Sequence, residues 1–88
     1  MSGLDELKKN ALQVSDEQEE LGRQFSGLVD ELNKDAGLIA KALGSHKTRE
    51  SVVNAIKKAS QAVESAAESC NNSAAVTRAY VAQHFGGQ

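Results

Sequence analysis

Residues 42–50 of the chain read ALGSHKTRE, and this stretch decides the fold. Gly44 suits the left-handed backbone conformation that follows the end of a helix. Ser45 or Thr48 can cap a second helix, with Glu50 in its first turn. A four-residue connection is typical of two helices that run antiparallel. We therefore predict a single all-α domain over residues 1–88, a helical hairpin with a helix at 4–43, a turn at 44–47 and a helix at 48–85.

The first predicted helix carries a regular apolar stripe. Steps of three and four residues give a stripe that is apolar at ten of its twelve positions: Leu4, Leu7, Ala11, Val14, Gln18, Leu21, Phe25, Leu28, Leu32, Asp35, Ile39 and Ala42. Such a heptad pattern predicts packing on a partner helix. Gln18 and Asp35 either specify that pairing or lie in solvent. Ser15-x-x-Gln18 resembles a capping box, so a helix break near residue 15 or at the internal glycines stays an alternative.

The second predicted helix has a wider apolar surface that consists mostly of small residues. A central stripe runs from Val52 to His84, and further lines flank it on both sides, from Val53 to Val81 and from Ala55 to Val76. Together they cover about 140° of the helix, more than one partner helix covers. We therefore predict that the hairpin pairs with a second hairpin into a four-helix bundle. The expected interface residues are Val52, Val53, Ile56, Ala59, Val63, Ala66, Ala67, Ala74, Tyr80 and Val81.

The charges are distributed unevenly along a chain whose formal net charge is −2. Residues 1–44 carry five basic and nine acidic groups, and residues 45–88 carry five basic and three acidic ones. Antiparallel helices of opposite sign attract each other, although each exposed pair contributes little. An acidic cluster at residues 16–20 is expected to face solvent. Solvent or an acidic partner helix is expected to cover the basic patch of Lys47, Arg49, Lys57 and Lys58.

The sequence contains no residue pattern that predicts catalysis, a metal site or a cofactor. His46 and His84 lie at opposite ends of the second predicted helix, and the single Cys70, expected to be buried, has no metal-ligand spacing. No basic block with interleaved aromatic residues predicts nucleic-acid binding. No apolar run approaches the ~20 residues of a membrane span, and the first ten residues lack the apolar segment of a signal peptide. We expect neither an enzyme nor stable membrane insertion, but a protein that binds another helical protein.

Residues 38–69, LIAKALGSHKTRESVVNAIKKASQAVESAAES, resemble the centre and second helix of the WXG100 (ESAT-6-like) family. Members of that family are short antiparallel helical hairpins without a leader sequence. Gly44 stands where the family has the glycine of its W-x-G turn, with Leu43 close to the place of the tryptophan. Tyr80 matches the tyrosine of the family's C-terminal Tyr-x-x-x-Asp/Glu export signal, and His84 stands in place of the acid. Small helical proteins that pair with LXG toxins are similar and also lack the W-x-G sequence.

The resemblance implies a function in bacterial type VII secretion, as a dimeric substrate or a co-secreted partner. It implies a helical partner, which is a second copy, a related hairpin or the N-terminal helical region of a toxin. It also implies synthesis in the cytoplasm and then secretion without a cleaved signal peptide, with Tyr80 and Phe85 as the candidate export signal. The alternative is an intracellular coiled-coil adaptor or assembly subunit, because long heptad stripes also occur in such proteins.

Overall fold

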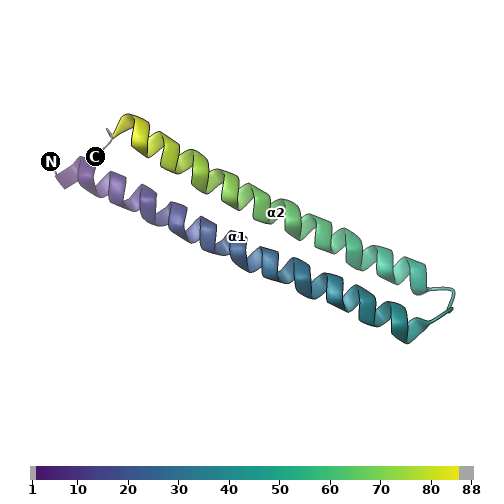
Figure 1. The fold of residues 1–88 in the computed structure, drawn as a ribbon. Helices are drawn as coiled ribbons and strands as arrows, with labels where there is room; N and C mark the ends of the chain where they lie inside the picture. The colour runs from purple at the N-terminus through teal and green to yellow at the C-terminus, as the bar shows by residue number, and fades with distance from the viewer. Residues whose placement is uncertain (1, 86–88) are drawn as a thin grey trace.

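The computed structural model of the chain describes residues 2–85, and they form two long α-helices joined by a short turn (Figure 1). Helix α1 spans Ser2–Leu43 and helix α2 spans Arg49–His84. The helices run antiparallel as a rod whose principal extents are 67 × 16 × 14 Å. No strand occurs within the described residues. The predicted all-α class and helical hairpin are confirmed, whereas pairing with a second hairpin stays a prediction.

The turn between the helices is closed by backbone hydrogen bonds and by a histidine side chain. Gly44 has a φ of 56°, the left-handed region that glycine enters without steric cost, and its N–H donates to the carbonyl of Ala40 at 3.2 Å. The side chain of Thr48 makes no capping hydrogen bond with α2. Its hydroxyl instead lies 2.9 Å from Nδ1 of His46, and its backbone N–H donates to the same nitrogen. Capping by Thr48 therefore differs from our expectation, because the hydroxyl is held within the turn.

Helix α1 is continuous through the position where the sequence allowed a break. Ser15 is fully buried, and its hydroxyl donates to the carbonyl oxygen of Ala11 at 3.0 Å, one turn earlier in the same helix. The hydroxyl of Ser15 therefore has its hydrogen-bond partner inside the helix and does not cap a new helix. Gly22 is also buried within α1. A Cβ atom there would meet the side-chain amide of Asn71 and lie 3.4 Å from the carbonyl oxygen of Ala67, so the two helices approach closely at this point.

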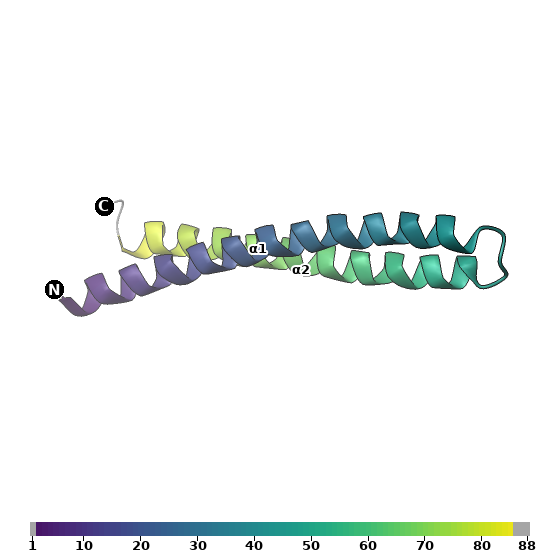
Figure 2. The same cartoon turned by 90° about the horizontal axis from the view of Figure 1, so that it is seen from below.

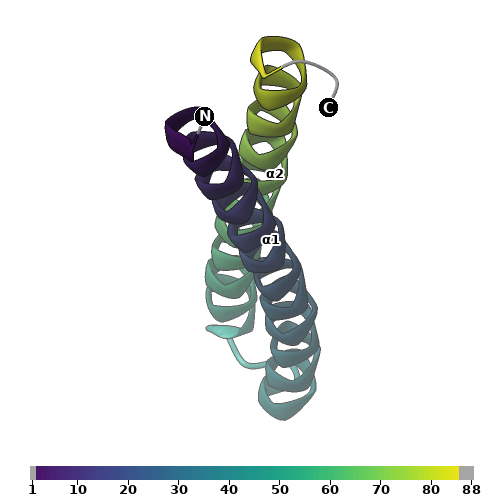
Figure 3. The ribbon, with the colours of Figure 1, turned by 90° about the vertical axis from the view of Figure 1, so that its left-hand side faces the viewer.

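The helices cross at a shallow angle, which Figures 2 and 3 show from below and along the rod. The most deeply buried side chains of their contact are mostly small, with larger ones half-buried around them: the buried ones are those of Ser15, Ala36, Ser60, Ala67, Ala74 and Val81. Small side chains let two helix backbones come close together. They also remove little apolar surface from water, which is worth roughly 25 cal/mol per Å². The isolated hairpin therefore has a thin core.

Candidate interaction surface

One line of large aliphatic side chains on α1 lies exposed on the hairpin. Leu7 is 59% exposed, Val14 is 47% exposed, and Leu21 and Leu28 are each 44% exposed. These four residues recur every seven positions, so they follow one line along the helix. Leu4, 58% exposed, lies about one turn before Leu7, beside this line. Helix α1 thus buries small residues such as Ala36 and leaves a ridge of large apolar ones open to solvent.

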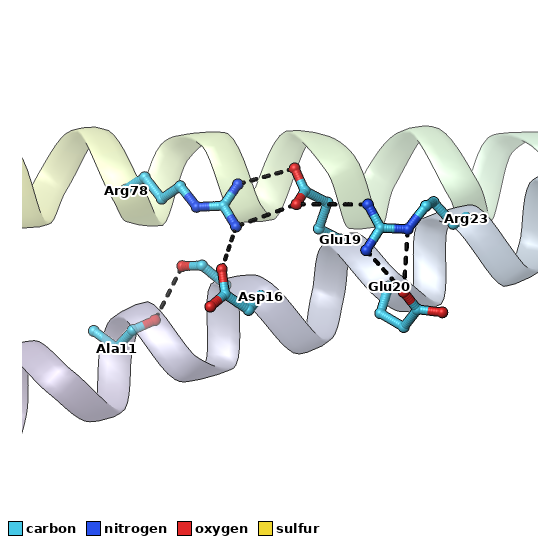
Figure 4. A network of polar contacts seen from close by, with 7 residues as sticks. Ala11, Asp16, Glu19, Glu20, Arg23 and Arg78 are labelled. Carbon is cyan, nitrogen blue, oxygen red and sulfur yellow. Dashed lines mark hydrogen bonds and ion pairs between the residues drawn. The ribbon is translucent and has the colours of Figure 1, made fainter.

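The opposite side of the hairpin is joined by polar contacts between the two helices. Arg78 on α2 donates to Asp16 at 2.6 Å and to Glu19 at 3.1 Å, both on α1 (Figure 4). Further along the rod, the hydroxyl of Ser60 donates to Oδ1 of Asn33 at 3.0 Å. We call this side the polar flank. Its side chains satisfy one another within a single chain.

Helix geometry places the apolar ridge of α1 and a strip of α2 on the same side of the rod. An α-helix has 3.6 residues per turn, so residues two apart point about 160° away from each other. Leu21 therefore faces away from the flank on which Glu19 lies, and Tyr80 faces away from the flank of Arg78. Glu19 and Arg78 form an ion pair, so they lie on the same side of the rod. Leu21 and Tyr80, which point away from them, therefore share the other side. We call this side the apolar face: Leu4, Leu7, Val14, Leu21 and Leu28 of α1, with Val52, Ala59, Ala66, Ser73 and Tyr80 of α2.

The structure divides the interface residues expected from the sequence between the inside and the outside of the hairpin. Ala67, Ala74 and Val81 are buried against α1, and Val53, Ile56 and Val63 are half-buried there. They contact the chain's own helix, and their expected role in a partner interface stays a prediction. Val52 and Ala66 are half-buried at the edge of the apolar face, and Ala59 and Tyr80 are exposed on it. The physical reason for this division is side-chain size. The line of small residues on α2, Ser60, Ala67 and Ala74, allows the closest approach of the helices and therefore faces α1.

The polar residues of the predicted α1 stripe have different surroundings. Asp35 is exposed. Gln18 is half-buried, and its Oε1 atom is buried without a hydrogen-bond partner among the described residues. A buried amide oxygen without a partner costs free energy, which opposes whatever the Gln18 side chain gains by packing. Cys70, expected to be buried, is half-buried on the α2 side of that contact.

The acidic cluster on α1 is held by two arginines, which the sequence analysis did not assign. Arg23 pairs with Glu20 at 2.7 Å and with Glu19 at 3.8 Å. Side-chain hydrogen bonds, to Glu20 for Arg23 and to Glu19 and then Asp16 for Arg78, raise the pKa of each guanidinium above its ordinary value. Both groups stay charged at physiological pH. Arg78 is the only lysine or arginine after position 58, and this isolated positive charge was the signal that sequence reasoning could have used.

The basic patch and the histidines lie at the two ends of the rod. An open groove of about 900 Å³ next to the turn is lined in part by His46, Lys47, Arg49 and Lys57. Gly44 and Ser45, the predicted turn residues, also line it. At the other end, the rings of Tyr80 and His84 stack with their centroids 4.2 Å apart.

The candidate export-signal residues both lie at that open end. Tyr80 is exposed on the apolar face, and Phe85 is half-buried. The two aromatics therefore differ in surroundings: Tyr80 is 57% exposed and stacks on His84, whereas Phe85 is half-buried.

Comparison with known proteins found no match of this chain to a protein-family model, a curated protein or a solved structure. Within residues 2–85, no group of three or more His, Cys, Asp or Glu side chains is arranged to hold a metal ion. Neither helix in that range combines the length and the apolar character that crossing a membrane requires.

Proposed function

We propose that this chain is a non-enzymatic assembly module that completes a four-helix bundle with a second helical hairpin. The apolar face carries this proposal. Its ridge, which runs along more than half of α1, is left exposed by the rest of the hairpin. The ridge consists of Leu4, Leu7, Val14, Leu21 and Leu28. A continuous line of large apolar side chains on a soluble chain is typical of a surface that binds a partner. The thin core of the hairpin supports the same proposal, because a second hairpin adds the missing burial.

We further propose that this assembly acts in bacterial type VII secretion, as an exported substrate or as the partner of an exported protein such as an LXG toxin. The resemblance of residues 38–69 to the WXG100 family supports this part of the proposal. The exposed Tyr80 supports it as well, because an aromatic side chain open to solvent near a terminus is available to a recognition partner. In this proposal the chain is synthesised in the cytoplasm and leaves the cell without cleavage of a signal peptide.

The test is export from a bacterium that has a type VII system, compared with the same strain lacking the export ATPase. We expect the uncleaved protein in the culture supernatant of the first strain and its absence from that of the second. Tyr80→Ala with Phe85→Ala should reduce export more strongly than it weakens partner binding, because both residues lie at the open end of the rod and most of the apolar face stays intact. Val76→Ala, at a similarly exposed apolar position of α2, is the matched control and should be exported normally.

Two outcomes contradict the export part of the proposal. Retention of the wild-type protein inside the cell in both strains would favour the intracellular coiled-coil adaptor, which uses the same apolar face. A joint loss of melting temperature, partner binding and export in the Tyr80 and Phe85 variant would make these aromatics structural. The tail would then carry no separate signal.

A further inference from the structure

The groove next to the turn opens on the polar flank of the rod, between the end of α1 and the start of α2. Its volume of about 900 Å³ lies within the range of sites that bind ligands in proteins. Asn33, which accepts the hydrogen bond from Ser60 on the polar flank, lines one end of this groove. The apolar face lies on the other side of the rod, so a hairpin bound there leaves the groove open.

The floor of the groove consists of small residues of α1. Ala36, Gly37, Ala40 and Gly44 line it, and a Cβ atom at Gly37 would meet no other atom within 4 Å. Small side chains let the backbone of another helix come close. From residue 33 to residue 44 the helix rises about 16 Å, or three turns. The shape of the groove therefore suits a helical segment of about three turns that lies along the rod.

The rim of the groove is basic. Lys47 and Arg49 lie at its turn end, and Lys57 lies toward the middle of the rod. His46 and Glu50 also line the groove, and Glu50 is the one acidic residue among the described residues that do so. Residues 36–58 as a whole carry five basic side chains and one acidic side chain. A groove lined by charges of one sign attracts a ligand of the opposite sign.

The basic residues of the rim have no counter-charge within the hairpin. Arg23 and Arg78 are paired with carboxylates of α1, whereas Lys47, Arg49 and Lys57 make no ion pair with any residue of the described range 2–85. The chain thus neutralises its arginines near the open end of the rod and leaves its charges near the turn without partners. A partner that brings carboxylates to the turn supplies the missing counter-charge.

The positions of the basic residues along α2 set the spacing of those carboxylates. Arg49 and Lys57 are about 12 Å apart along the helix axis, and Val53 lies halfway between them. Val53 is half-buried and is the largest aliphatic side chain in the groove. On a partner helix, residues two turns apart lie on one face and are separated by about 11 Å. Two carboxylates at this spacing reach both ends of the rim, with the residue between them over Val53.

We propose that this groove binds an acidic helical segment of a partner protein. Two carboxylates, two turns apart on the segment, lie at Arg49 and Lys57, and an apolar side chain between them packs on Val53 and Ala40. This inference goes beyond the assembly function, because it uses the polar flank and leaves the apolar face free. The hairpin then holds two partners, or two parts of one partner, on opposite sides.

Nucleic acid and an anionic membrane fit this groove less well. The described residues that line it include no aromatic residue of the kind on which a base stacks. Asp16 and Glu19 lie on the same flank, so a phosphate chain that followed the rod would meet like charges. The groove presents no large apolar side chain for insertion into lipid, since Val53 is half-buried within it.

The first experiment measures binding of a fluorescein-labelled peptide to the full chain by fluorescence anisotropy. The probe is a helical peptide of about 18 residues with two Glu residues two turns apart, Leu between them, and Ala and Gln elsewhere. A matched peptide of the same composition has its Glu residues about 140° apart around the helix. We expect saturable binding of the probe at about 0.05 M salt, at least about threefold weaker binding of the matched peptide, and loss of most binding at about 0.5 M salt.

The second experiment reverses one charge on the rim. Lys57→Glu should weaken binding of the probe about five- to tenfold, because an attractive contact becomes a repulsive one. Lys58→Glu makes the same change at the next position, which does not line the groove, and should weaken binding less than about threefold. Both residues are exposed, so both variants should fold like the wild-type chain.

The third experiment fills the floor of the groove. Gly37→Leu places a side chain where the structure has open space, so it should weaken binding of the probe about tenfold without loss of helicity. Gly27→Leu is the matched control, because Gly27 also has open space around it and does not line the groove. Circular dichroism checks that both variants are folded.

Three results would overturn the inference. The first is the absence of saturable binding of the probe up to about 500 μM at low salt. The second is an equal loss in Lys57→Glu and Lys58→Glu, because binding would then follow the net charge of the chain. The third is tighter binding of an oligothymidylate or of phosphatidylglycerol vesicles than of the probe, with the same dependence on Lys57, which would assign the groove to phosphate groups.

The assembly function and this inference fail separately. Leu28→Glu, on the apolar face, should leave binding of the acidic probe unchanged. Lys57→Glu should leave binding of a second hairpin to the apolar face unchanged. Loss of one interaction with the other intact therefore identifies which of the two proposals is wrong.

Discussion

The polar flank and the apolar face of the hairpin differ in whether their side chains find partners within the same chain. On the polar flank, Arg78 and Ser60 of α2 find their partners on α1, so this side is complete within one chain. On the apolar face, Leu21 and Leu28 contact too little of their own chain to be covered. The difference teaches that polar contacts join the two helices within one chain, whereas the leucine ridge stays exposed on the hairpin. In the proposed assembly a second hairpin covers this ridge.

The largest expected effect comes from placing a charge on the apolar face. Leu28→Glu should weaken the proposed assembly with a second hairpin at least about 100-fold, or ~2.7 kcal/mol, because assembly would bury an unpaired carboxylate. The matched control is Ser26→Glu, which adds the same charge two residues away on the polar flank and should change Kd less than about threefold. Sedimentation of both variants at one salt concentration measures the difference. Equal losses in the two variants would mean that the two sides of the rod do not differ in function.

The next largest effect comes from enlarging a side chain between the helices. Ala74 is 1% exposed in the contact with α1, so Ala74→Leu should cost about 1–3 kcal/mol of hairpin stability through overpacking. Ala75→Leu, at the exposed neighbouring position, should change stability little. Urea unfolding followed by circular dichroism measures both. A neutral Ala74→Leu variant would show that the small-residue line does not form the contact between the helices.

A smaller effect is expected on the outward side of α1, away from both surfaces. A Cβ atom at Gly27 would meet no atom within 4 Å, so Gly27→Ala should stabilise the hairpin by about 0.5–1 kcal/mol through lower backbone entropy of the unfolded chain. Gly44→Ala should do the reverse, because Gly44 has a positive φ. Thermal unfolding compares the two. A destabilised Gly27→Ala variant would indicate an unseen contact on that side.

The smallest effect is expected from the polar flank itself. Arg78→Gln removes the ion pairs with Asp16 and Glu19, and it should lower Tm only slightly, because solvent screens exposed pairs. Arg23→Gln is the control, since its pairs lie within α1 and do not connect the helices. The decrease for Arg78→Gln should shrink at high salt. A large and salt-independent decrease would mean that this flank contributes more than orientation.

The hairpin was predictable because its signals are local. Gly44 ends one helix, the absence of proline lets both helices run long, and the heptad spacing of apolar residues indicates packing along their whole length. Ser15 was a source of ambiguity for the same reason. A serine followed three residues later by glutamine suits a helix start, and only the burial of Ser15 against α2 reveals that it lies inside a continuous helix.

The sequence by itself determined the helices, the turn and the presence of more apolar surface than two helices can cover. The tertiary structure decided how that surface is divided. Each helix has adjacent heptad lines that could face the other helix, and the choice depends on both helices at once. Close approach through Ala67, Ala74 and Gly22, with Arg78 tied to Glu19, turned the small residues inward. The leucine ridge was therefore left outside, because one helix-to-helix contact is too narrow to bury both lines.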